Sequence, residues 1–175
     1  MRIIALAVLL AALAGCTAKP SLEDPPVSGI ELELEEFFEG ELVAYGQVQD
    51  LFGTVRDRFR VEIEGSWDGE VLTLVEDFIY ADGHTEQRIW TLRQTGPESW
   101  EGTAPGVIGV ATGQERGDAF NWTYTIDLPL REGSRVVSFD DWMWQLGEDR
   151  LLNIAYMRKF GLDLAQVVIV FEKRG

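Results

Sequence analysis

Apolar residues recur at every second position from Leu42 onward, and this period constrains the fold more than any other feature of the 175-residue chain. Alternation of apolar and polar side chains is typical of a β-strand with one buried face. The clearest strand follows residue 118, and its apolar face consists of Phe120, Trp122, Tyr124, Ile126, Leu128 and Leu130. Further strands are predicted over residues 59–64, 71–81, 86–93, 135–144, 151–159 and 167–173.

Short turns join these strands, and Asp82-Gly83 is the strongest hairpin signal because both residues tolerate a positive φ. Connections this short exclude parallel crossovers, which need a dozen or more residues. We therefore predict one all-β domain over residues 30–175, an antiparallel up-and-down β-barrel of about 8–10 strands. Leu34, Phe37 and Phe38 have helical spacing, so at most one short helix precedes the barrel. An open β-sandwich is the alternative.

The N-terminus has the pattern of a targeting segment. Residues 1–15 contain a basic start, an apolar run too short to span a bilayer, and small residues before Cys16. Leu13-Ala14-Gly15-Cys16 resembles the lipobox of bacterial lipoproteins, which implies removal of residues 1–15, a diacylglycerol on Cys16 and an acyl group such as palmitate on its new amine. An ordinary signal peptide is the alternative. Residues 16–29, with three prolines, are predicted to be the lipidated cysteine and a flexible tether.

Residue 17 is threonine, where an aspartate would be the usual signal for retention in the inner membrane of Gram-negative bacteria. By this resemblance, the protein is predicted to face the periplasm from the inner leaflet of the outer membrane. The formal net charge of −15 argues against nucleic acid as a partner and against lying flat on anionic lipid. We therefore expect the lipid anchor, and not the surface charge, to hold the protein at the membrane.

Several short motifs follow one another over residues 37–173: Phe38-Glu39-Gly40, Glu76-Asp77-Phe78, Gly109-Val110-Ala111-Thr112-Gly113, Phe139-Asp140-Asp141-Trp142-Met143 and Lys159-Phe160-Gly161. Together they resemble a family of bacterial lipoproteins, domain-of-unknown-function family 3833. The resemblance implies a lipocalin-like barrel and no established activity. Asp118 and Pro105 stand where the family usually has an asparagine and an acidic residue, and both lie in or near predicted turns.

The residue types that enzymes use for nucleophilic or metal chemistry are scarce in this chain. His84 is the sole histidine and directly follows the Asp82-Gly83 turn, where we expect it to be exposed, and Cys16 is the sole cysteine. These residues supply neither a plausible Ser-His or Cys-His pair nor a set of zinc ligands. We therefore predict that the protein is not an enzyme and uses no metal or cofactor.

Two pairs of adjacent acids, Glu76-Asp77 and Asp140-Asp141, lie in predicted strands. Neighbouring residues of a strand point to opposite faces, so at most one member of each pair points inward. Glu76, Arg88 and Asp140 are the candidates for structural ion pairs. Recognition of a ligand headgroup, catalysis and calcium binding are the alternative roles for these carboxylates.

Asn153, Ala155, Met157 and Lys159 share one face of a strand, and this mixture of small, flexible and polar side chains suits the wall of a cavity. If that face is interior, Lys159 can bind a carboxylate or phosphate headgroup. The candidate ligand-binding residues are Trp122, Tyr124, Asp140, Trp142, Asn153, Met157 and Lys159. Alternatively, the face meets solvent and the aromatic residues pack the core.

Together these features predict a protein anchored at the outer membrane that binds or carries a fatty acid or other lipid in envelope lipid homeostasis. Its expected partners are the membrane, through the anchor, and the lipid ligand, with no nucleic acid. A filled barrel that docks on an envelope protein is the alternative. A third hypothesis is an enzyme that acts on lipid through carboxylates such as Asp140.

Overall fold

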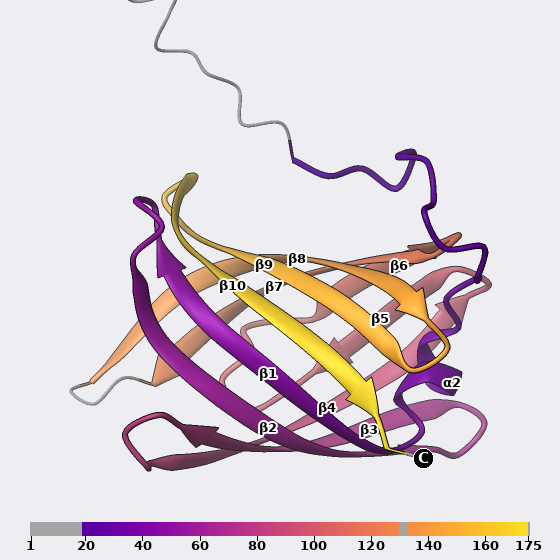
Figure 1. Cartoon of the computed structure of the whole chain (residues 1–175), viewed down its shortest axis with the longest axis horizontal. Coiled ribbons are helices and arrows are strands. Elements are labelled where there is room, and N and C mark those ends of the chain that lie inside the picture. Colours follow the sequence, from indigo (N-terminus) through magenta and orange to yellow (C-terminus); the bar gives the residue numbers. More distant parts are fainter. Residues whose placement is uncertain (1–18, 130–132, 175) are drawn as a thin grey trace, which may run out of the picture.

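The computed structural model describes residues 19–129 and 133–174, which form a closed antiparallel β-barrel of ten strands (Figure 1). The elements are α2 (Leu34–Phe38), β1 (Gly40–Asp50), β2 (Val55–Trp67), β3 (Val71–Tyr80), β4 (Thr85–Gly96), β5 (Ser99–Thr103), β6 (Ala111–Arg116), β7 (Ala119–Pro129), β8 (Ser134–Gly147), β9 (Arg150–Lys159) and β10 (Leu162–Lys173). Each strand pairs with the next along the chain, and β10 pairs with β1. The predicted all-β barrel with one short N-terminal helix is confirmed.

Strand register determines which side chains point into the barrel. One row of partners runs from Val48 on β1 through Val167, Ala155 and Asp141 to Trp122 on β7. Directly paired residues point to the same face of a sheet, and all five of these side chains line the interior. The apolar face predicted for the strand after residue 118 is therefore the interior face of β7, except that Leu130 lies outside the described residues.

The helix α2 packs into one end of the barrel, here called the closed end (Figure 1). Its apolar residues Leu34, Phe37 and Phe38 are all buried. The Phe38 ring meets Phe171 of β10 edge-on, with ring centroids 5.4 Å apart. Glu115 Oε1 accepts a hydrogen bond of 2.9 Å from the backbone N–H of Leu34, which fastens the first turn of the helix to β6.

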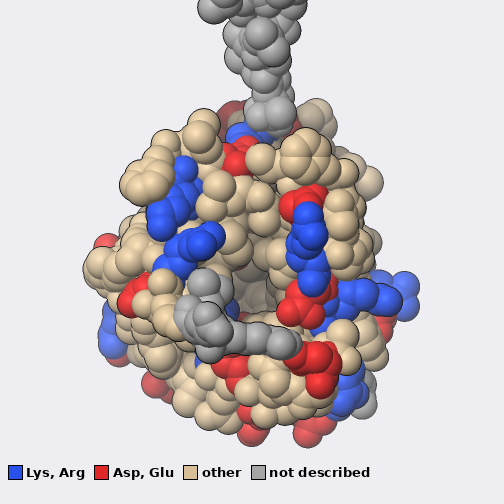
Figure 2. Space-filling model, turned by 90° about the vertical axis from the view of Figure 1, so that its left-hand side faces the viewer, with Lys and Arg blue, Asp and Glu red and all other residues tan. Residues whose placement is uncertain are grey.

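The opposite end of the barrel is here called the mouth. Turns at residues 51–54, 81–84 and 160–161 lie around it. Figure 2 looks into this end and shows a hollow with basic and acidic side chains around it. The barrel is therefore a cup, with its floor formed by α2.

Residues 19–31 run along the outside of the barrel before Leu32 and α2 (Figure 1). Asp118 Oδ2 accepts hydrogen bonds from the backbone N–H groups of Val27 and Ser28, at 2.9 and 3.1 Å. Lys19 Nζ lies 2.7 Å from Asp163 Oδ2. Glu23 also forms an ion pair with Arg116 of β6. Residues 19–29, predicted as part of a tether, thus contact the barrel at Asp163, Arg116 and Asp118. The predicted signal peptide and Cys16 lie outside the described residues.

The barrel core consists of two clusters of buried apolar side chains. The larger cluster lies beneath α2 and includes Leu34, Phe38 and Trp100, while the smaller includes Ile126 and Phe139. All ten strands and both clusters come after residue 31, so a chain that begins at residue 19 keeps the whole barrel. Within residues 19–129 and 133–174, no helix is long and apolar enough to cross a membrane.

Candidate functional site

A cavity of about 200 Å³ lies inside the barrel. Side chains from α2 and from every strand except β5 and β6 line it, and most of them are apolar. The lining extends from Leu34 and Phe38 at the closed end to Tyr80 and Met157 near the mouth. The cavity therefore follows the axis of the cup.

Aromatic rings form one side of the cavity, here called the aromatic wall: Trp90, Phe120, Trp122, Tyr124 and Phe139. Neighbouring rings are in contact, with centroids 5.1 Å apart for Trp90 and Tyr124 and 5.2 Å apart for Tyr124 and Phe139. Gly113 on β6 makes room for the wall, because a Cβ there would lie 2.5 Å from the rings of Phe120 and Trp122. The wall offers a ligand a large apolar surface held by ring–ring packing.

Two acids and one arginine interrupt the apolar lining and are here called the polar patch: Glu76 on β3, Arg88 on β4 and Asp141 on β8. Glu76 and Arg88, both candidates for interior ion pairs, face each other across β3 and β4. The Arg88 guanidinium forms an ion pair with Glu86, with Nη2 and Oε1 3.0 Å apart. The Arg88 guanidinium thus interacts with the carboxyl groups of both Glu76 and Glu86.

Burial raises the pKa of both carboxyl groups in the polar patch. The pKa of Glu76 rises to about 7, because loss of hydration outweighs the attraction of Arg88. The pKa of Asp141 lies well above its usual range, because burial and the nearby charge of Asp140 together outweigh Arg88. A protonated carboxyl can donate a hydrogen bond, so the patch can act as a donor at a pH where exposed carboxylates only accept.

Asp141 also carries a polar atom that the protein leaves unpaired. The residue is 7% exposed, and its Oδ1 has no hydrogen-bond partner among the described residues. An unsatisfied buried polar group costs roughly 1–3 kcal/mol. Asn153 on the neighbouring strand is satisfied in part, because its Nδ2 donates to the Trp142 carbonyl at 3.2 Å. The cavity therefore offers a polar group of a ligand a partner at Asp141.

The structure brings four of the seven predicted ligand-binding residues to the cavity wall: Trp122, Tyr124, Asn153 and Met157. Lys159 has the same strand phase as Asn153 and Met157 but stands at the mouth end of β9, outside the cavity lining. Its Nζ lies 5.4 Å from the centre of the Phe160 ring. The position of Lys159 along the barrel, and not its face, separates it from the cavity.

Asp140 and Trp142 do not line the cavity, because Asp141 occupies the inward position of β8. Asp141 is paired with Trp122 and Ala155, both of which line the cavity, so its neighbours on β8 point outward. Asp140 accepts a hydrogen bond of 2.9 Å from Asn121 Nδ2. This placement corrects the interior ion pair and ligand contact expected for Asp140, and the ligand contact expected for Trp142.

Sequence reasoning missed two carboxyl groups at the site, Asp141 and Glu86. The adjacent acids at positions 140 and 141 show that one points inward, but the choice between them depends on the register of β8. The signal for Glu86 was present, because it precedes Arg88 by two positions and so shares its face. The predicted partners of Arg88 were therefore incomplete.

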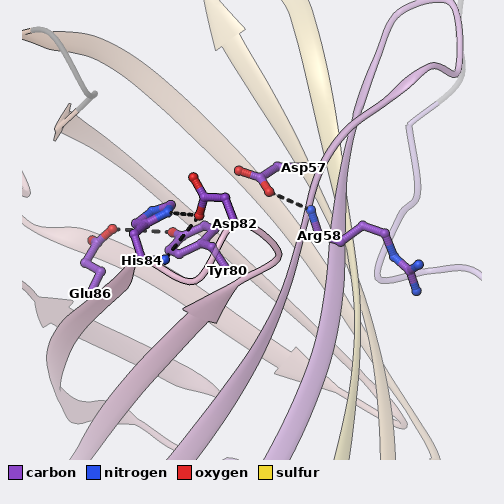
Figure 3. A network of polar contacts seen from close by, with 6 residues as sticks. All are labelled: Asp57, Arg58, Tyr80, Asp82, His84 and Glu86. Atoms are coloured by element: carbon purple, nitrogen blue, oxygen red, sulfur yellow. Dashed lines mark hydrogen bonds and ion pairs between the residues drawn. The ribbon is translucent and has the colours of Figure 1, made fainter.

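A network of polar contacts lies at the β3–β4 turn, at the mouth of the barrel (Figure 3). The His84 imidazole stacks on the Tyr80 ring with centroids 3.9 Å apart, and its Nδ1 lies 2.5 Å from Asp82 Oδ1. The Tyr80 hydroxyl donates to Glu86 Oε2 at 3.4 Å, and Glu86 in turn binds Arg88. His84 is exposed on the β3–β4 turn, as predicted.

The acids around the cavity are not arranged as a metal site. Within the part of the chain that the structure describes, no three His, Cys, Asp or Glu side chains are grouped so that they could hold a metal ion.

Comparison with known proteins identifies the fold and a family model. The model described as "Protein of unknown function (DUF3833)" matches residues 10–173. Comparison with curated proteins found no match. An S-type phycobiliprotein lyase from Guillardia theta has a similar structure, with a TM-score of 0.60, 10% identity, and coverage of 82% of this chain and 93% of that chain. A redesigned β-barrel bound to DFHBI has a TM-score of 0.42 and 7% identity, with coverage of 79% and 97%. The likeness to the lyase shows a shared lipocalin-like barrel fold.

Proposed function

We propose a binding function for this chain, which belongs to the DUF3833 family: its barrel holds one molecule of a single-chain amphiphile, such as a fatty acid. The hydrocarbon lies against the aromatic wall and the polar group lies at the polar patch. The protein is a non-catalytic carrier, anchored through Cys16 in the inner leaflet of the outer membrane and facing the periplasm. The proposal depends above all on one observation, an apolar cavity that contains the unpaired Asp141 Oδ1 and the Arg88 guanidinium.

The apolar lining supports a hydrocarbon as the main part of the ligand. Each buried methylene contributes about 0.8 kcal/mol, so a chain of about ten methylenes contributes roughly 8 kcal/mol. Association itself costs an estimated 4–15 kcal/mol in lost freedom. Burial of the ligand's hydrocarbon alone would therefore give weak binding, and polar contacts are needed to reach a useful affinity.

The size of the cavity supports a ligand with one chain. Its volume of about 200 Å³ is below the roughly 300–1,000 Å³ of common ligand pockets. A two-chain phospholipid exceeds this space, whereas part of a single acyl chain fits along the axis of the cup.

The polar patch supports an anionic or hydrogen-bonding headgroup. A guanidinium can bind a carboxylate through two parallel hydrogen bonds, but Glu76 and Glu86 compete for Arg88. Protonation of Glu76, whose pKa is about 7, removes one competitor. Neutral Asp141 can then donate a hydrogen bond to the same headgroup. We therefore expect an anionic ligand to bind more tightly below pH 7 than above it.

Native mass spectrometry of the chain from residue 19, purified without detergent, tests the proposal. We expect an amphiphile at one molecule per chain, either co-purified and identified by organic extraction, or bound after incubation with palmitate. A diacyl phospholipid is the matched control and should not bind. A mass that stays that of the empty protein with palmitate would contradict the proposal and favour a filled barrel that docks on an envelope protein.

A further inference from the structure

Two turns at the mouth expose large apolar side chains. Phe52 on the β1–β2 turn and Phe160 on the β9–β10 turn are each 93% exposed, and Leu51 and Leu162 beside them are 63% and 69% exposed. The turns are neighbours because β1 pairs with β10, and Figure 1 shows them side by side at the upper left. These four residues are here called the apolar rim.

The backbone conformation of Phe160 is unfavourable for a phenylalanine, so the stability of the fold does not explain why a phenylalanine stands there. Its φ of 53° is the one positive value at a non-glycine residue in the described part of the chain. Bulky L-residues are strained in the left-handed region, which the next residue, Gly161, adopts without a Cβ clash. The chain thus keeps a strained aromatic residue at an exposed tip. Such strain, when it persists, points to a role outside the folded core.

The charges around the apolar rim differ in sign from the charge of the whole chain. The chain has a formal net charge of −15, but residues 50–58 and 158–163 carry four Lys or Arg and three Asp or Glu. Two of these acids are paired: Asp50 with Arg56, and Asp163 with both Lys19 and Arg158. The pairs leave Arg58 and Lys159 as further cations beside the rim. Apolar tips flanked by cations fit a bilayer surface, where apolar side chains enter the acyl region and cations meet lipid phosphates.

The N-terminal segment approaches the same rim. Lys19 Nζ lies 2.7 Å from Asp163 Oδ2 and 3.4 Å from the centre of the Tyr156 ring. Asp163 directly follows Leu162 of the apolar rim. Three residues of extended chain span at most about 11 Å. A lipid on Cys16, three residues before Lys19, would therefore hold this rim close to the bilayer.

We propose that the apolar rim inserts into the surface of a phospholipid bilayer and turns the mouth of the barrel toward it. An amphiphile then passes between the bilayer and the cavity without crossing bulk water, and this consequence rests on the proposed function. Insertion itself needs no ligand in the cavity. A protein partner is the competing occupant of an exposed apolar surface, so the tests use lipid alone.

Partition onto vesicles of phosphatidylethanolamine and phosphatidylglycerol tests insertion with the chain from residue 19, which keeps the whole barrel. Changing Phe52→Ser and Phe160→Ser together should lower the ratio of vesicle-bound to free protein at least about tenfold. The matched control changes two exposed apolar residues away from the mouth, Val27→Ser and Leu146→Ser, which are 94% and 53% exposed. An equal loss in both double variants, or no loss in the first, would overturn the inference.

A second experiment holds the same chain at the vesicle surface by a tag, so that it tests insertion even if the untagged protein binds vesicles weakly. The sole cysteine is Cys16, so the chain from residue 19 accepts one nitrobenzoxadiazole dye at Phe160→Cys or at Leu146→Cys. An N-terminal polyhistidine tag on nickel-chelating vesicles takes the place of the anchor. The dye emission should rise several-fold on vesicles at position 160 and stay constant at position 146. Equal responses, or none at position 160, would contradict insertion.

Palmitate binding separates this inference from the proposed function. The double variant Phe52→Ser and Phe160→Ser should bind palmitate in solution as the original chain does. Arg88→Met should weaken palmitate binding and leave vesicle partition unchanged. If the double variant also loses palmitate, the rim acts on the cavity and is not a separate membrane contact, which would overturn the inference.

Discussion

The closed end and the mouth of the barrel use the same residue types in opposite ways. Phe38 at the closed end is 3% exposed and packs on Phe171, whereas Phe160 at the mouth is 93% exposed. The barrel is thus stabilised mainly beneath α2, and its other end is free for contacts outside the fold. Phe38 therefore stabilises the fold at the closed end, whereas Phe160 is exposed to solvent at the mouth.

Two buried acids, Glu115 beside α2 and Glu76 in the cavity, also differ in their roles between these two parts of the barrel. Burial raises the pKa of Glu115 and of Glu76 to about 7 in both cases. Glu115 accepts a hydrogen bond from α2, so we expect its titration to change stability. Glu76 faces Arg88 in the cavity, so we expect its titration to change ligand binding. Equal pKa values therefore have different consequences at the two places.

Loss of the anchor is the largest expected effect, because it decides whether the mouth is held at a membrane. Cys16→Ser, secreted behind a signal peptide of the ordinary cleavable type, should move nearly all of the protein to the soluble periplasmic fraction. Each buried methylene of an acyl anchor contributes about 0.8 kcal/mol. Cell fractionation with immunoblotting measures the effect, and Thr17→Ser behind the native signal should stay with the membranes. Persistence of Cys16→Ser in washed membranes would contradict the anchor.

Truncating an aromatic ring should separate the two ends in stability. Phe38→Ala should lower the free energy of unfolding by about 3–5 kcal/mol, because it leaves a cavity under α2. Phe160→Ala should change that free energy by at most about 0.5 kcal/mol, because its ring is exposed. Urea unfolding of both variants measures the difference. Equal effects would remove the contrast between a packed end and a free end.

Titration of Glu115 should make the barrel less stable as the pH rises. A carboxyl with a pKa of about 7 when folded and about 4.5 when unfolded binds its proton more tightly in the folded state. Its contribution to stability is therefore complete below about pH 4.5 and is lost as the pH rises through about 7, a loss on the order of 3 kcal/mol.

Glu115→Gln isolates that contribution, since its amide oxygen can still accept from the Leu34 N–H. Urea unfolding at about pH 5 and about pH 8 should show a smaller loss of stability in this variant than in the original chain. Glu101→Gln on the exposed face of β5 is the control and should leave the loss unchanged. A Glu115→Gln variant with the original pH dependence would show that the titration belongs elsewhere.

Removing the guanidinium from the polar patch should weaken ligand binding without loosening the closed end. Arg88→Met should lower palmitate affinity by about 10- to 100-fold, since a hydrogen bond to a charged group contributes roughly 1.5–3 kcal/mol. Calorimetric titration measures the affinity. Arg93→Met is the matched control on the outer face of the same strand and should leave the affinity unchanged. Equal affinities of both variants would remove Arg88 from the site.

The pH dependence of binding is the smallest expected effect. Palmitate affinity should fall by up to about tenfold between about pH 6 and about pH 8, because ionised Glu76 competes with the ligand for Arg88. Glu76→Gln should flatten that dependence. Fluorescence titration at both pH values measures it, with Glu115→Gln as the control that keeps the dependence. A profile that Glu76→Gln leaves unchanged would assign the effect to another group.

Much of the fold could be predicted because its signals are local. Alternation over residues such as 120–128 and the turn at Asp82-Gly83 depend only on neighbouring side chains, and the structure confirms both the strands and the barrel. Of the seven ligand-binding candidates, four line the cavity. Asp140 was wrongly expected to point inward, because the sequence does not show which of two adjacent acids does so. The pairing of Asp141 with Trp122 shows that Asp141 is the inward one.

The sequence by itself determined the class of fold and the family, because period-two patterning, short turns and ordered motifs need no knowledge of distant contacts. Only the tertiary structure decided which face is interior, which end α2 closes and which acids meet Arg88. These depend on register around a closed ring of ten strands, where residues far apart in the chain become neighbours. Phe160 and Phe38 belong to motifs of the same family, and only their positions along the barrel separate an exposed tip from a buried floor.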